Sequence, residues 1–136
     1  MKKTNENLVI LITLFAISIV IANVTGARTI TFTKTVHAAS VTLAEPLTVE
    51  GDITVAVLQV TGSIPDDAVF KTEVTNNAND PSPVWQDATT NVKKGVNIVF
   101  ENKTATAGAA FNFRVSISRG ASGTGGYIEA VSGAFQ

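Results

Sequence analysis

Few residues in this chain are of the types that carry out catalysis, and their spacing is not typical of an active site. One histidine and no cysteine occur among the 136 residues, which excludes thiol nucleophiles, thiolate metal sites, disulfides and a multi-histidine metal centre. His37 has no recognisable pattern of nucleophile and acid around it, so we expect a structural role for it. The sequence therefore predicts a protein that is not an enzyme and uses no cofactor.

Two further patterns could in principle bind an ion. Asp66, Asp67 and Asp80 could supply oxygen ligands to calcium, but they do not form a spaced D-x-D-x-D loop, and the adjacent pair is typical of a turn. The glycines of residues 120–126 follow an expected strand, as phosphate-binding glycines do, but neither the lysine–serine/threonine ending nor a helix comes after them. We predict no metal site and interpret residues 120–126 as a hairpin loop.

Two asparagines stand in the acceptor pattern for N-glycosylation. Asn23 and Asn102 each begin an N-x-T triplet. Asn23 lies at the end of an apolar run, and Asn102 lies in an expected loop. Both are possible glycosylation sites.

The N-terminal segment is strongly apolar. Residues 8–24 carry no charge, and with the residues up to Ala27 the run is about 20 residues, which as a helix of roughly 30 Å matches a bilayer core. We predict a hydrophobic helix over residues 1–27 that acts as a membrane anchor, an assembly helix or a secretory signal, with the rest of the chain exported. The apolar residues expected to pack through this helix are Leu8, Ile10, Leu11, Leu14, Phe15, Ile17, Ile19 and Ile21.

Residues 28–136 have the pattern of a β domain. Apolar residues alternate with polar ones along Thr29–Val36 and Phe111–Ile117, and Ile53–Val60 is apolar enough for a central strand. Turn-forming residues separate about seven or eight such segments. We therefore predict an all-β fold, an antiparallel β-sandwich of the immunoglobulin-like or jelly-roll type, with a turn or one helical turn near residues 87–94. Six of the seven phenylalanines and Trp85 are expected in its core.

The block Phe70–Phe135 resembles small β-sandwich domains of phage tail and fibre proteins and of bacterial surface proteins. The resemblance is carried by the polar stretch Asn76–Pro83, by Trp85, Asp87 and Thr89, and by the strands Phe111–Ile117 and Tyr127–Phe135. It implies a sandwich architecture and a surface context, and it implies no reaction.

The overall layout is similar to that of pilin-like subunits, in which a polar leader and an apolar helix precede a β-rich head. The chain departs from the bacterial type IV pilin pattern, because no Gly or Ala cleavage residue precedes the apolar run and Glu6 stands before that run rather than inside it. Such a layout implies filaments with helices in the core and heads outside.

We therefore expect a non-catalytic structural subunit of an extracellular surface assembly, a pilin-like filament or a virion component. Its partners would be other copies of itself, and the membrane through the N-terminal helix. A formal net charge of −1 gives no basic surface for nucleic acid. The alternative is a membrane-anchored or secreted adhesin, a carbohydrate-binding module whose possible glycan would meet Trp85 or Tyr127.

Overall fold

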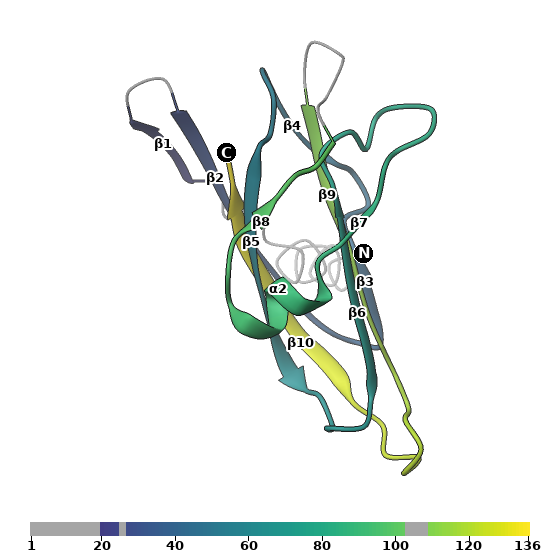
Figure 1. Cartoon of the computed structure of the whole chain (residues 1–136). Coiled ribbons are helices and arrows are strands. Elements are labelled where there is room, and N and C mark those ends of the chain that lie inside the picture. Colours follow the sequence, from purple (N-terminus) through teal and green to yellow (C-terminus); the bar gives the residue numbers. More distant parts are fainter. Residues whose placement is uncertain (1–19, 25–26, 103–108) are drawn as a thin grey trace, which may run out of the picture.

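The strands of this protein form two antiparallel sheets that pack face to face as a β-sandwich (Figure 1). The computed structural model describes residues 20–24, 27–102 and 109–136, with side chains from Thr29 onward. Sheet A has the order β1-β2-β10-β5-β8, and sheet B has the order β3-β9-β6-β7, with β4 also paired to β9. The elements are β1 Val20–Val24, β2 Ala27–Ala38, β3 Ser40–Thr42, β4 Leu47–Val49, β5 Val55–Ser63, β6 Val69–Thr75, β7 Gln86–Asp87, α2 Thr89–Lys94, β8 Ile98–Val99, β9 Ala109–Ser118 and β10 Tyr127–Phe135.

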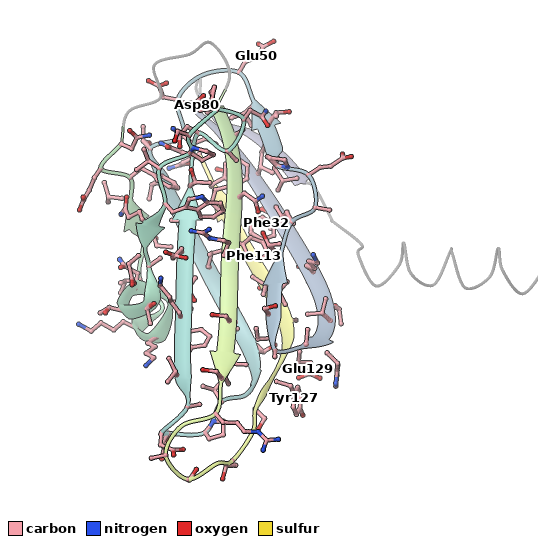
Figure 2. The ribbon with its side chains drawn as sticks, turned by 90° about the vertical axis from the view of Figure 1, so that its right-hand side faces the viewer. Phe32, Glu50, Asp80, Phe113, Tyr127 and Glu129 are labelled. Atoms are coloured by element: carbon pink, nitrogen blue, oxygen red, sulfur yellow. The ribbon has the colours of Figure 1, made fainter. Side chains whose placement is uncertain are left out.

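A layer of aromatic rings fills the space between the sheets. Phe32 on β2 is fully buried, and its ring centroid lies 5.7 Å from those of both Phe111 and Phe113 on β9. Phe135 on β10 stacks on Phe111 with a centroid distance of 4.6 Å. Figure 2 shows Phe32 and Phe113 side by side in the middle of the sandwich. Each sheet thus contributes one apolar face, as the alternating pattern of its strands requires.

The predicted core is confirmed for most of its aromatic residues and wrong for one. The phenylalanines of the β region are buried or pack against the buried cluster, with Phe100 only partly buried. Trp85 instead lies half-buried outside this cluster. It directly precedes β7, on the outer face of sheet B, so its ring does not enter the space between the sheets.

The helix predicted over residues 1–27 is wrong for its last part. Val20–Val24 is strand β1, paired antiparallel with β2 from Val20↔Thr31 to Val24↔Ala27. Ile21 therefore lies in a strand, and sheet A begins before the expected boundary at residue 28. The β-branched residues of β1 favour extended backbone, and β2 supplies hydrogen-bond partners for it. The other apolar positions named for this helix, from Leu8 to Ile19, lie outside the described residues.

The secondary structure differs from the prediction in smaller ways too. Ten strands are present in the described part of the chain, more than the seven or eight expected, because β1 was expected to be part of a helix and the two-residue strand β7 is too short to show a period. The central strand expected at Ile53–Val60 is β5, which is buried on one face and half-covered on the other. No helix in the described residues is long and apolar enough to span a membrane.

The short helix expected near residues 87–94 is confirmed as α2, which contacts β5 and β6 at the side of the sandwich (Figure 1). The carboxylate of Asp87 accepts a hydrogen bond of 2.8 Å from the Thr89 N–H at its start. Gly95 ends the helix in the left-handed conformation at φ 64°, and its N–H bonds to the Val92 carbonyl. Glycine adopts this conformation at little cost, whereas a side chain would strain it.

We predict that Phe111→Ala lowers the free energy of unfolding by about 3–5 kcal/mol, because Phe111 on sheet B contacts the rings of Phe32 and Phe135 on sheet A and its removal leaves a cavity. Urea denaturation followed by circular dichroism measures the effect. Val99→Ala is the control, since Val99 is 67% exposed and should change stability by less than about 0.5 kcal/mol. Equal effects of the two substitutions would contradict the central position of the aromatic layer.

Candidate functional site

The three aspartates considered as calcium ligands do not come together. The carboxylate of Asp67, in the turn between β5 and β6, accepts hydrogen bonds from the N–H of Ser122 at 2.6 Å and from its hydroxyl at 3.0 Å. Asp80 lies at the other end of the sandwich (Figure 2) and accepts a hydrogen bond of 2.9 Å from the Asn77 amide. Within residues 27–102 and 109–136, no three His, Cys, Asp or Glu side chains lie close enough to hold a metal ion.

The glycine-rich residues 120–126 connect β9 of sheet B to β10 of sheet A, so the predicted hairpin loop is instead a connection between the sheets. The loop is pressed against the β5–β6 turn. A Cβ atom at Gly120 would stand 1.8 Å from the Asp67 carbonyl oxygen, so the close approach of the two backbones requires glycine. The glycines therefore serve packing, and the Asp67–Ser122 hydrogen bonds fasten the loop.

We predict that this fastening weakens in acid. Hydrogen bonds from the Ser122 N–H and hydroxyl lower the pKa of Asp67 from its usual value near 3.8, because they stabilise the carboxylate. Their stabilising contribution is present above that value and is lost as the pH falls through the lowered pKa of the folded state.

An NMR titration should show the Ser122 amide shift moving with the Asp67 carboxyl below pH 3.8. Asp67→Asn should abolish this movement, whereas Asp66→Asn, at the exposed neighbouring carboxylate, should leave it intact. A Ser122 amide shift that stays constant through the acid range would contradict the assignment.

Buried amide side chains hold the loops at the Asp80 end of the sandwich. Asn76, which is 1% exposed, donates hydrogen bonds of 2.9 Å to the carbonyls of both Ile53 and Asn102. Asn112 bonds to the N–H and the carbonyl of Leu43, where the edge of sheet B bends between β3 and β4. These asparagines were not singled out from the sequence, because nothing in their spacing indicates that they are buried.

We predict that Asn76→Ala lowers the free energy of unfolding by about 2–3 kcal/mol, because it leaves the Ile53 carbonyl without its partner inside the protein. The exposed Asn79 in the same loop is the matched control, and Asn79→Ala should be neutral. Denaturant titration of both variants gives the comparison. If Asn76→Ala were as stable as the wild type, the network would not be what holds this loop.

Trp85 is held on the outer face of sheet B by Arg114, which is itself held by an ion pair. The guanidinium carbon of Arg114 lies 3.8 Å from the ring centroid of Trp85, a cation–π contact. The carboxylate of Glu73 binds Arg114 at 3.1 Å and Lys71 at 3.0 Å. One face of the indole is thus covered by a guanidinium that is itself held in place.

Gln86, the next residue, joins the edges of the two sheets. Its side-chain amide donates a hydrogen bond of 2.8 Å to the Val99 carbonyl, and its oxygen accepts one of 3.1 Å from the Glu101 N–H. The amide therefore bonds to the β8 segment as a neighbouring strand would. We call this junction of residues 84–87 with residues 98–102 the edge seam.

A groove of about 380 Å³ runs along the edge seam. Three of its residues are apolar or aromatic, two carry carboxylates and two carry amides. They are Val84, Trp85, Gln86, Asp87, Phe100, Glu101 and Asn102. Its volume lies within the range of small-molecule sites, and its lining combines aromatic rings with hydrogen-bonding groups.

The other residues predicted for function lie elsewhere or are engaged in the fold. Tyr127 is at the opposite end of the sandwich from Asp80 (Figure 2), where its ring stacks on His37 with a centroid distance of 5.0 Å. The side-chain amide of Asn102 donates to Asn76, so the nitrogen that a glycan would take already makes a hydrogen bond. Asn23 lies in β1, outside the side chains described. Glycosylation of both stays a prediction.

No family model matches the sequence, and no curated protein matches it. A chain in a solved structure of infectious bursal disease virus, Gx strain, is similar to this one with a TM-score of 0.39 and 9% sequence identity. The similarity covers 88% of this chain, which spans 37% of that protein. The resemblance to phage and bacterial surface domains stays a prediction.

Proposed function

We propose that this chain is a structural subunit of an extracellular surface assembly, a filament or a virion, in which copies join through the edge of strand β1 that no described residue pairs with. The support comes from a contrast among the edges of the two sheets. A sheet edge exposes unpaired N–H and C=O groups and binds another strand unless something blocks it. In the described part of the chain, the edges other than β1 are short or occupied by side chains.

Two of these edges meet at the edge seam. β7 and β8 have two residues each, and the Gln86 amide takes up the Val99 carbonyl and the Glu101 N–H. A strand from another molecule would have to displace these hydrogen bonds. The seam is therefore a poor site for strand addition.

The edge of sheet B formed by β3 and β4 is blocked in another way. The ammonium group of Lys34, a buried residue of β2, donates to the Thr42 carbonyl, and burial lowers the pKa of Lys34. Asn112 takes the backbone groups of Leu43, and Pro46 lacks an N–H. No continuous row of backbone groups is left here for a partner.

No described residue covers the outer edge of β1. Its five residues, VIANV, include no charge and no proline, and within the described residues it pairs on one side, with β2. Uncharged segments of β-branched residues are the ones most prone to pair with another copy. The edge of β1 that no described residue pairs with is the observation that carries the proposal.

The apolar run that precedes β1 also suits contact with neighbouring subunits. With Val20–Val24 in the sheet, twelve apolar-run residues, Leu8–Ile19, remain before it. As a helix they would extend about 18 Å, short of the roughly 30 Å core of a bilayer. We therefore favour packing among copies of the chain over a membrane span as the role of this run.

The test is to place like charges on the proposed contact. In an antiparallel pair of β1 strands centred on Ala22, Ile21 of one copy faces Asn23 of the other. Ile21→Lys/Asn23→Lys should abolish oligomers of the full-length chain, because facing lysines repel. Sedimentation velocity and negative-stain microscopy of matched samples give the readout.

Two controls make the result specific. Val69→Lys places the same charge on an exposed valine of β6 and should leave assembly unchanged. Mixing the lysine variant with Ile21→Glu/Asn23→Glu should restore assembly, since opposite charges then face each other. A full-length wild type that stays monomeric, or assemblies that persist in the lysine variant, would overturn the proposal.

A further inference from the structure

We propose that the groove at the edge seam binds a glycan, with Trp85 as its aromatic platform and the carboxylates of Asp87 and Glu101 as acceptors for sugar hydroxyls. This inference goes beyond the assembly role, because it uses the opposite edge of sheet A from β1. Such a site would allow the subunit to bind a glycan in addition to assembling with other copies of itself.

The two aromatic side chains of the groove are fixed in place by contacts within the protein. Trp85 is fixed by Arg114 on one side, and Arg114 is held by Glu73 at 3.1 Å. Phe100, the second ring of the groove, packs against the core. Side chains that are already immobilised lose little conformational entropy when a ligand binds. This smaller entropy cost raises the affinity for a ligand that makes weak contacts, such as a sugar. The C–H groups of a pyranose ring suit such apolar surfaces, and its hydroxyls suit the polar rim.

The polar groups divide into those used by the fold and those open to a ligand. Gln86 bonds to the β8 segment through both its nitrogen and its oxygen, and Asn102 bonds to Asn76 through its nitrogen. One carboxylate oxygen of Asp87 accepts a hydrogen bond from the Thr89 N–H, and the other oxygen accepts none from the described residues. Glu101 is exposed and engages Gln86 through its backbone N–H. The charged acceptors open on the rim are therefore carboxylate oxygens of Asp87 and Glu101, which accept hydrogen bonds from hydroxyl groups.

Other kinds of ligand fit the groove less well. Asp87 and Glu101 would repel a phosphate or a nucleic acid, and Arg114 is already paired with Glu73. A peptide strand would find the backbone of the edge seam taken by Gln86. An uncharged polyhydroxylated ligand satisfies both the rings and the carboxylates, and a cationic ligand is the competing outcome of the test.

The experiment is a glycan array probed with the full-length protein, followed by calorimetry on the best-bound oligosaccharide. Trp85→Ala should weaken binding by at least about tenfold, equivalent to about 1.4 kcal/mol. Glu101→Ala, at an exposed side chain that the fold does not use, should weaken it severalfold. Tyr127→Ala removes the exposed aromatic at the far end of the sandwich and should leave affinity unchanged.

The outcomes separate the possibilities clearly. A tenfold loss of affinity in Trp85→Ala, with the affinity of Tyr127→Ala unchanged, supports the site. If Trp85→Ala fails to fold, the site is supported by a loss of affinity in Glu101→Ala together with a ligand-induced change in the NMR shift of the Trp85 indole N–H in the wild type. The inference is overturned if no glycan on the array binds, if Glu101→Ala and Trp85→Ala bind as the wild type does, or if spermine, used as a cationic probe, shifts the indole signal while glycans do not. Assembly of the same samples is scored separately by sedimentation.

Discussion

The packing of Phe32 between Phe111 and Phe113 is the interaction on which the rest of the structure depends. Each sheet has one apolar face, and neither face can be removed from water without the other sheet. The three rings come from strands in both sheets, so their contact fixes how the sheets align. The loops, the seam and the outer faces take their positions from this alignment.

Hydrogen bonds from amide side chains hold the loops and strand edges in place beyond the aromatic layer. At one end, Asn76 and Asn112 satisfy backbone groups of loops that leave the sheets. At the side, the Gln86 amide bridges two strand edges that are too short to pair with each other. Asn76 and Asn112 bond to backbone groups that are buried away from water, whereas the groups bonded by Gln86 are exposed. Consequently the edges they cover are unavailable to other strands, and β1 stands out by contrast.

Most of the strands were predictable from the sequence because apolar and polar residues alternate along them, or because the segment is apolar throughout, as at Ile53–Val60. Phe111, Phe113 and Val115 face inward as the period-two pattern requires, and the helical turn near residue 89 follows from its polar, non-alternating residues. β1 was not predictable, because a run of uncharged apolar residues fits a helix and a strand equally well, and only pairing with β2 distinguishes them.

The groove was not predictable for a related reason. Trp85 is large and apolar, which favours a core position, yet the register of β7 on β6 directs its ring to the outer face. Gln86 and Asn102 look like ordinary loop residues in the sequence, and their hydrogen bonds join segments 13 and 26 positions apart. Contacts between such distant segments leave no local pattern in composition or spacing.

The place of β10 in the middle of sheet A has a consequence for how the chain matures. β10 is the last strand in sequence, and it pairs with both β2 and β5. Sheet A therefore cannot close until residues 127–135 have left the ribosome, and the edge of β2 that β1 does not cover must wait for its partner about a hundred positions downstream. Folds dominated by such distant pairings form slowly. The domain therefore stays open while residues 27–126 are being made, and its sheet A is completed only by its last strand.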